Sequence, residues 1–197
     1  MRNVLDRLSG LAYATDGPLR VSGLGDRTGS ATGVLVPLLA SWDIPVEYTF
    51  TDQSPLLVAQ ARRTLGKKYP FMKLAVQDIE RPPSDGLAGQ QHIVIASHCV
   101  HATRSLTDST RNIRQALRPN GFLMTFEMKE AWPALDITFG LYEGWWLFED
   151  GRTHEYTQPE VWQRSLAEAG YGAVDWTDGE LPEHKYYMVL IALASKV

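Results

Sequence analysis

Short strand-like runs alternate along the chain with longer segments in which apolar residues recur at helical spacing. The runs LRVSGL from Leu19, VEYTFT from Val46 and HIVIAS from His92 are each followed by a polar or glycine-bearing turn. Strands that alternate with helical segments are typical of parallel βαβ units, and a continuously apolar strand fits a sheet covered on both faces. The pattern predicts an α/β fold built on a mostly parallel sheet.

The predicted elements follow one another in a regular order. Strands are predicted at 19–24, 46–52, 72–76 and 92–97, and over GFLMTFEM after a turn at 118–121. Helices are predicted from the first turn through Leu39, at 54–65 with Ser54 as N-cap, at 106–117 and at 159–169. Two late strands, at 173–176 and in KYYMVLIALA, are close enough in sequence to form an antiparallel hairpin beside the parallel strands.

The segment after Met128 differs from the rest of the chain in composition and in hydrophobic pattern. From Trp132 to Tyr156 it is rich in aromatic residues and has no regular period. We therefore predict an irregular aromatic cover, inserted over the sheet at 132–157. No internal repeat or linker divides the sequence, so 1–197 is predicted to be a single domain.

The composition agrees with one globular domain and disfavours several kinds of partner. The chain has 197 residues, 44% of them hydrophobic and 21% charged, enough for one core but not for two. A net charge of −4 gives no broad positive field, so neither nucleic acid nor a membrane surface is expected as a partner. The single cysteine, Cys99, excludes an internal disulfide, and no targeting or membrane-spanning segment is evident. We expect a cytoplasmic protein that acts on a small-molecule or protein-borne substrate.

Candidate chemistry lies after the predicted strands, because ligands of open α/β sheets bind beyond the carboxyl ends of the strands. The first strand runs into a turn with Gly23, Gly25 and Gly29, which permits close backbone approach to a ligand. Asp52 ends the second strand, where a carboxylate can accept hydrogen bonds from ribose hydroxyls. Asp78 follows the third strand, where a carboxylate can accept a hydrogen bond from an adenine amine. The alternatives are an ordinary tight turn for the glycines and a solvated, helix-flanking carboxylate for Asp52.

The glycine spacing also matches the GxGxxxG turn of nicotinamide-dinucleotide enzymes. The one Tyr-x-x-x-Lys sequence, from Tyr69 to Lys73, contains Pro70 and lies at the entrance of the predicted third strand. That position is unsuited to the acid of a short-chain dehydrogenase, so an oxidoreductase is disfavoured.

The longest informative segment reads IASHCVHATRSLTDSTRNIRQALRPNGFLMTFEM. Together with VEYTFTDQS, VQDIE and ITFGLYEGWWLFEDGR, it resembles the methyltransferase domains embedded in fungal and bacterial polyketide synthases. The resemblance extends from Leu19 to Gly170, and ASxxxHAT, RNxRxxLRPxG and EGWWLF are its most specific parts. It implies a class I methyltransferase fold, a Rossmann-like three-layer sandwich whose mostly parallel seven-stranded sheet has an antiparallel last strand. It also implies S-adenosylmethionine as cofactor, with no metal.

The resemblance implies catalytic roles for two residues. The histidine of the HAT segment, His101, resembles the base that removes a proton from the α-carbon of a β-ketoacyl thioester, and Glu127 resembles the partner that orients it. The chemistry of these side chains agrees, because imidazole titrates near neutral pH and a carboxylate behind it fixes the tautomer. The alternative for His101 is a helix-start histidine that caps backbone groups.

Further positions are assigned by the same resemblance. His98 stands where the family usually has an asparagine near the cofactor, and it either contacts the methionine part of the cofactor or packs. Trp145, Trp146 and Tyr156 are expected to line the acyl and pantetheine tunnel, although two tryptophans in a cover also suit a simple core. The complete set of predicted cofactor contacts is Gly23, Gly25, Arg27, Gly29, Asp52, Gln53, Asp78, Ile79, Ser97 and His98.

The first turn departs from the family pattern ExGxGxG. Gly23 stands at the place of the acid, which removes an expected partner of the cofactor's amino group. Arg27 stands at the place of the central glycine. Its side chain either crowds the cofactor, points away from it, or pairs with the carboxylate of the cofactor. Two alternatives to C-methylation therefore remain: a degenerate pseudo-methyltransferase of a synthase and an O- or N-methyltransferase of small molecules.

In the family that this chain resembles, a lid precedes the first strand. Residues 1–18 are shorter than such a lid, and we predict that they are a residual part of it. The expected partners are an acyl carrier protein that delivers the substrate and other synthase domains, because a thioester tether raises the effective concentration of a weakly bound chain.

Overall fold

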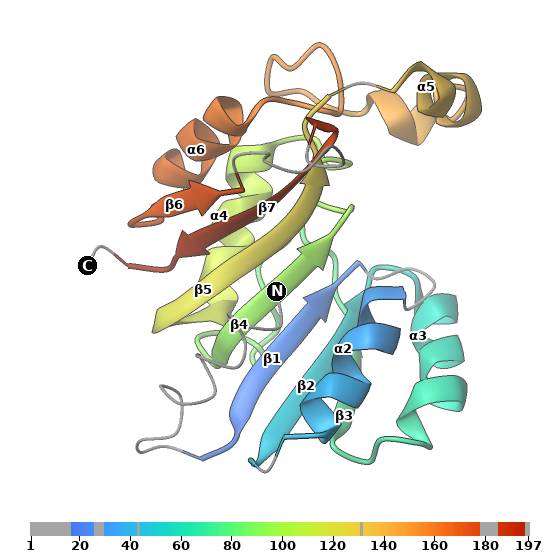
Figure 1. Ribbon diagram of the computed structural model, residues 1–197, viewed down its shortest axis with the longest axis vertical. Helices are drawn as coiled ribbons and strands as arrows, with labels where there is room; N and C mark the ends of the chain where they lie inside the picture. The colour runs from blue at the N-terminus through green and yellow to red at the C-terminus, as the bar shows by residue number, and fades with distance from the viewer. Residues whose placement is uncertain (1–16, 26–29, 43, 131, 178–184, 196–197) are drawn as a thin grey trace.

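The computed structural model describes residues 17–25, 30–42, 44–130, 132–177 and 185–195, and it is an α/β structure with seven strands in one sheet (Figure 1). The strands are β1 (Leu19–Leu24), β2 (Val46–Asp52), β3 (Met72–Val76), β4 (Gln91–Ser97), β5 (Leu117–Met128), β6 (Val174–Trp176) and β7 (Tyr187–Leu193). The helices are α2 (Ser30–Ala40), α3 (Pro55–Ala61), α4 (Leu106–Ala116), α5 (Pro133–Phe139) and α6 (Pro159–Glu168), with a π-helical turn η1 (Arg62–Gly66) and a 3₁₀ turn η2 (Glu143–Trp146).

The sheet has the strand order β3-β2-β1-β4-β5-β7-β6. Strands β1 to β5 are parallel, and β7 lies between β5 and β6, antiparallel to both. The prediction of a mostly parallel seven-stranded sheet with an antiparallel last strand is confirmed. The order reverses between β1 and β4, so the crevice between their carboxyl ends is the switch point at which open α/β sheets bind ligands.

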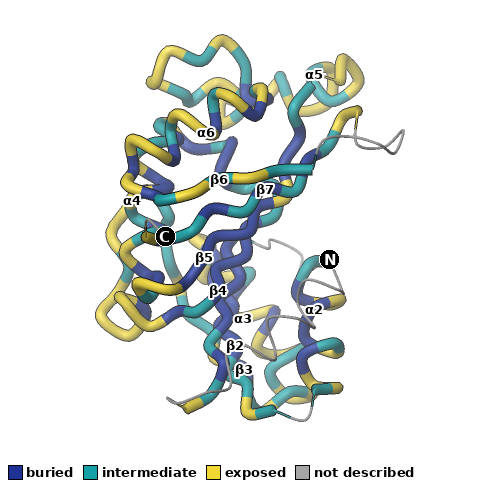
Figure 2. The backbone as a smooth tube through the Cα atoms, turned by 60° about the vertical axis from the view of Figure 1, so that its left-hand side comes forward, coloured by how far each residue is buried: buried dark blue, intermediate teal, exposed yellow. Residues whose placement is uncertain are grey.

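Helices cover both faces of the sheet, which gives the predicted three layers (Figure 2). One apolar cluster packs α4 and α6 against β4, β5 and β7, with Trp162 and Leu166 fully buried. The other packs α2 and α3 against β1, β2 and β3, around Phe50 and Tyr48. The predicted run HIVIAS is buried from Ile93 to Ala96 because it is sandwiched between these two clusters.

Local signals in the sequence account for several element ends. The Ser54 hydroxyl caps α3 by accepting a hydrogen bond from the Leu57 amide at 3.5 Å, as predicted. The Ser105 hydroxyl caps α4 through the Asp108 amide at 3.1 Å. These caps fix where each helix begins after its strand, and therefore where the intervening loops lie.

Two predicted segments differ from the structure. The turn predicted at 118–121 is absorbed into β5, because pairing continues on both sides of it. The register steps from Gln91 opposite Leu117 to Ile93 opposite Phe122, so the extra residues form a bulge rather than a turn between elements. The aromatic segment after Met128 is not wholly irregular, because it contains α5 and η2.

In the described ranges no helix is both long and apolar enough to cross a membrane. Residues 1–16 of the predicted lid lie outside the described residues.

Candidate active site

A cavity of about 300 Å³ lies at the carboxyl ends of β1, β2 and β4. Its walls come from the turn after β1, the start of α3, the loop after β3 and the loop after β4. The lining residues are Gly25, Asp52, Gln53, Ser54, Leu57, Gln77, Asp78, Ile79, Glu80, Cys99, Ala102 and Thr103. The cavity therefore occupies the switch point and brings together Gly25, Asp52, Gln53, Asp78 and Ile79 of the predicted cofactor contacts.

Both predicted carboxylates of this cavity are held by backbone amides. Asp52 Oδ1 accepts a hydrogen bond from the Ser54 amide at 2.8 Å, and Asp78 Oδ1 accepts one from the Glu80 amide at 2.9 Å. Asp52 is only 3% exposed, so the alternative of a solvated carboxylate beside a helix is wrong. Two positioned carboxylates in one cavity suit the recognition of hydroxyl and amine donors.

The glycines of the first turn have different roles in the structure. Gly25 has φ +56°, and a Cβ there would lie 2.6 Å from Cys99 Cβ, so this position requires glycine. Gly23 lies inside β1, where a Cβ would meet Tyr48 Oη at 2.2 Å, and it does not line the cavity. Gly23 therefore serves the packing of β1 against β2. Arg27 and Gly29 lie outside the described residues.

His101 and Glu127 meet as the sequence predicts. Their elements are neighbours, because β4 and β5 pair in parallel and His101 follows β4 in the loop before α4. His101 Nδ1 lies 2.5 Å from Glu127 Oε2 in a buried hydrogen bond. Glu127 is 0% exposed, and its Oε1 also accepts from the Val100 amide at 3.3 Å and from the Thr125 hydroxyl at 3.1 Å. These bonds fix the carboxylate, which in turn orients the imidazole.

A second carboxylate, which the sequence analysis did not single out, faces the other nitrogen of His101. Glu155 Oε2 lies 3.6 Å from His101 Nε2, and Glu155 is only 2% exposed. The imidazole therefore lies between two buried carboxylates, one on each ring nitrogen. No local pattern in THEYTQPE marks Glu155, because its proximity to His101 depends on how the chain after η2 returns over the sheet.

A second cavity, of about 650 Å³, lies beside His101 beneath the aromatic segment. It is lined by Gln53, His98, His101, Ala102, Met128, Leu135, Phe139, Tyr142, Gly144, Trp145, Leu147, Glu155, Tyr156 and Tyr187. Gln53 and Ala102 line both cavities, so the two spaces adjoin at these residues. His101 borders only the larger one.

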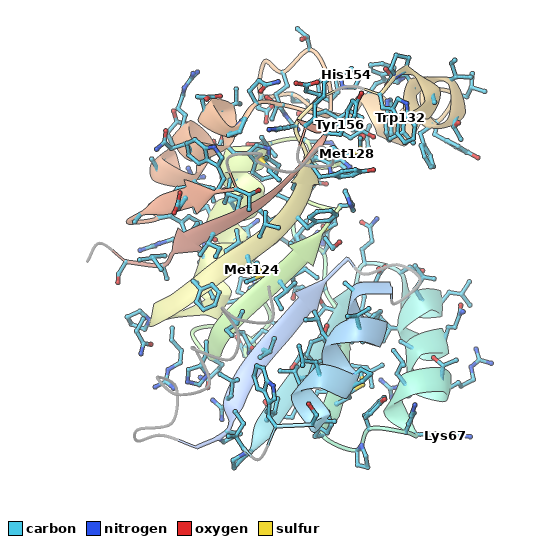
Figure 3. The ribbon with its side chains drawn as sticks, viewed as in Figure 1. Lys67, Met124, Met128, Trp132, His154 and Tyr156 are labelled. Carbon is cyan, nitrogen blue, oxygen red and sulfur yellow. The ribbon has the colours of Figure 1, made fainter. Side chains whose placement is uncertain are left out.

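The predicted substrate residues fall in two groups. Trp145 and Tyr156 line the larger cavity, and Figure 3 shows Tyr156 at the same end of β5 as Met128, another lining residue. Trp146 does not line the larger cavity. It is half-exposed, and its indole N–H donates to the Gly140 carbonyl at 2.9 Å. Burial, followed by the nearby charge of Glu155, raises the pKa of Tyr156, so its phenol stays neutral over the ordinary pH range.

His98 and Ser97 do not line the smaller cavity. His98 lies in the larger one with φ +50°, a left-handed conformation that histidine and asparagine adopt more readily than most residues. Its ring packs edge-on against Phe126 at 4.7 Å between centroids.

Arg152 ties the aromatic segment to the loop that carries His101. Its guanidinium donates to the His101 carbonyl at 2.9 Å and to the Thr103 carbonyl at 2.6 Å, and its Nε donates to Asp150 Oδ1 at 2.7 Å. Asp150 in turn accepts from the Leu106 amide at 2.9 Å, at the first turn of α4. Burial acts to raise the pKa of Asp150, but the hydrogen bonds from Arg152 and Leu106 outweigh it and lower that pKa.

Several lining residues escaped the sequence analysis. Cys99, Ala102 and Thr103 flank His98 and His101 in the loop after β4, so the rule that ligands bind after strands could have found them. Ser54 and Leu57 begin α3 directly after Asp52, and the same rule applies. Gln77 and Glu80 flank Asp78 in the loop after β3.

The strand order, the three layers and a cavity at the switch point define a class I methyltransferase fold. A family model described as a methyltransferase domain matches residues 24–123, half of the chain, and the chain belongs to this family. Over 181 residues it is 55% identical to the non-reducing polyketide synthase SAT8 of Stachybotrys chartarum, a match that covers 92% of this chain and 7% of the synthase.

Solved structures extend the comparison. The CMeT domain of the citrinin polyketide synthase has 49% sequence identity and a TM-score of 0.90, with 96% of this chain and 51% of that chain covered. The trans-methyltransferase CalH, in complex with SAH, has 32% identity and a TM-score of 0.76, with 89% and 51% covered. This chain therefore spans about half the length of these structures and a small part of the synthase.

Proposed function

We propose that this chain is an S-adenosylmethionine-dependent methyltransferase that methylates the α-carbon of a β-ketoacyl thioester borne on an acyl carrier protein. The observation that carries the proposal is the buried His101–Glu127 pair, whose imidazole borders the larger cavity where that cavity adjoins the smaller one of about 300 Å³. The similarity to the citrinin synthase CMeT domain supports carbon as the methyl acceptor. The similarity of this chain to one part of the much longer synthase SAT8 supports a carrier protein and neighbouring synthase domains as partners.

The residues of the smaller cavity fit the proposed cofactor. The carboxylates of Asp52 and Asp78 are fixed acceptors, suited to ribose hydroxyls and to an adenine amine. Leu57 and Ile79 add apolar walls for a flat base, and Gly25 leaves the backbone open to close approach. S-adenosylmethionine supplies an activated methyl group on a sulfonium centre when it is bound.

The chain's own task in this chemistry is to generate and hold a carbanion. Glu127 accepts the Nδ1–H of His101, which leaves Nε2 as the basic nitrogen on the side of the larger cavity. His101 then removes the acidic α-proton of the β-ketoacyl thioester, and Glu127 stabilises the imidazolium that forms. Trp145 and Tyr156 exclude water around the acyl chain, which protects the carbanion from reprotonation.

His101→Ala tests this proposal directly. With S-adenosylmethionine and an acetoacetyl-pantetheine thioester, we expect the wild-type chain to form the α-methyl product, detected by mass spectrometry. Loss of the base should lower kcat by about 10²- to 10⁴-fold. Calorimetric titration should show unchanged affinity for S-adenosylmethionine, because His101 does not line the smaller cavity.

His92→Ala is the matched control, because His92 lies near the start of β4, at the opposite end of the strand from the loop that carries His101, where its Nδ1 accepts from the Arg20 amide at 3.0 Å. It should leave turnover near the wild-type level. Undiminished turnover in His101→Ala would remove the base assignment. Methylation of alcohols or amines but not of the thioester would favour O- or N-methylation, and no cofactor binding at millimolar concentration would favour a pseudo-methyltransferase.

A further inference from the structure

Glu155 places a carboxylate opposite the basic nitrogen of His101. The distance from Glu155 Oε2 to His101 Nε2 is 3.6 Å, which is an ion-pair distance and longer than a hydrogen bond. Glu155 and Tyr156 are both buried at the end of the aromatic segment, and both line the larger cavity. The carboxylate therefore lies beside the atom that receives the substrate proton in the proposed reaction.

The surroundings of His101 make this carboxylate electrostatically significant. Glu127 on β5 contacts Nδ1, Glu155 faces Nε2, and the Tyr156 and His98 rings lie 5.8 and 6.3 Å away between centroids. Arg152 binds the backbone carbonyl of His101 at 2.9 Å. A buried anion is costly unless a cation is close, so Glu155 favours the imidazolium form of His101.

We propose that Glu155 is a positioning residue that raises the basicity of His101 and stabilises the imidazolium that forms. This inference rests on the proposed function. The α-C–H bond breaks, its electron pair stays on the substrate as the enolate, and the proton forms an N–H bond with His101 Nε2. The proton stays on Nε2, and the imidazolium is stabilised by Glu127 at Nδ1 and by the Glu155 carboxylate beside Nε2. Once the product has left, the imidazolium releases the proton to water in the larger cavity, which both His101 and Glu155 line, and the neutral imidazole is restored.

Histidine titration tests the electrostatic half of the proposal without cofactor or substrate. NMR of protein labelled with ¹⁵N-histidine gives the imidazolium pKa of His101, whose signals are assigned by their loss in His101→Asn. In Glu155→Gln we expect that pKa to fall by about one pH unit, because removal of a negative charge disfavours the imidazolium. An unchanged pKa overturns the proposal.

Glu143→Gln is the matched control, because Glu143 is an exposed glutamate of the same aromatic segment, in η2. It should leave the His101 titration at its wild-type position. If Glu155→Gln does not fold, Glu155→Asp keeps the charge but withdraws it from Nε2. A smaller fall in the same direction then supports the proposal, and no fall overturns it.

The pH profile tests the kinetic half. In Glu155→Gln we expect the acid limb of kcat to move to lower pH, the plateau to fall by about tenfold and KM to stay constant, with partial rescue in Glu155→Asp. An unchanged profile, with methylation intact in the wild type, overturns the role of Glu155 but leaves the proposed function standing. Absence of methylation in the wild type defeats the proposed function, and the histidine titration still decides whether Glu155 controls the charge of His101.

Discussion

Glycine is required at position 25 for two independent reasons. Its φ of +56° strains any side-chain-bearing residue, and a Cβ would lie 2.6 Å from Cys99 Cβ on the neighbouring loop. Gly25→Ala should therefore lower the free energy of unfolding by about 2 kcal/mol or more, measured by urea denaturation. It should also weaken cofactor binding at least about tenfold by calorimetry, because Gly25 lines the smaller cavity.

Gly33→Ala provides the control for that prediction. Gly33 is an exposed position of α2, and a Cβ there meets nothing within 4 Å. Alanine should stabilise the helix by about 0.5–1 kcal/mol, since glycine loses more backbone entropy on folding. A Gly25→Ala protein as stable as the wild type, with full cofactor affinity, would show that the turn after β1 relaxes away from Cys99.

The sequence could predict the site residues that lie at strand ends. It could not predict those that a distant segment of the chain brings to the site as it folds back over the sheet. Asp52, Asp78, His101 and Glu127 all follow or end parallel strands, whose carboxyl ends share one edge, so their approximate meeting could be inferred from order alone. Glu155 reaches His101 only through the path of the chain after η2, and nothing in its sequence neighbourhood reports that path.

At the scale of elements, Arg152 acts as a clamp between the aromatic segment and the loop after β4. Arg152→Ala leaves the buried His101 and Thr103 carbonyls without their guanidinium donor, and each such loss costs about 1–3 kcal/mol. We expect the free energy of unfolding to fall by about 3 kcal/mol in urea denaturation, with kcat reduced because His101 is less well held.

Arg111→Ala is the comparison variant for the clamp, because Arg111 makes an exposed ion pair with Asp108 within α4. Such pairs contribute little, so stability should change by no more than about 0.5 kcal/mol. Equal effects of the two arginine variants would mean that Arg152 contributes only a surface charge.

The two mispredicted segments show how pairing in space overrides local signals. Arg-Pro-Asn-Gly has the composition of a turn, but β5 pairs with β4 on both sides of it, so the extra residues bulge within one strand. The segment after Met128 lacks a long helical period, and α5 and η2 are too short to produce one. The bounds of β1 to β4 were predicted closely, whereas β5 begins at Leu117 rather than at Gly121.

At the scale of the whole molecule, two cavities lie side by side at the carboxyl edge of the sheet, and they share Gln53 and Ala102 as lining residues. The smaller cavity lies at the carboxyl ends of β1, β2, β3 and β4, whereas the larger one lies beyond the carboxyl ends of β4 and β5 and beside the start of β7, under the aromatic segment. Methyl transfer requires the two reactants to meet, so the residues that line both cavities control the approach. Ala102 is the smaller of these, and it follows His101 directly.

Ala102→Leu should therefore impair both binding events together. We expect calorimetry to show affinity for S-adenosylmethionine and for a non-hydrolysable acetoacetyl-pantetheine analogue each reduced by about tenfold, since the added carbons occupy the shared wall. Leu57→Phe, which enlarges a residue of the smaller cavity only, should weaken the cofactor alone, and Leu147→Phe should weaken the thioester analogue alone. If Ala102→Leu affects only one ligand, the two cavities are functionally separate at this residue, and Gln53 becomes the remaining position at which cofactor and acyl chain can meet.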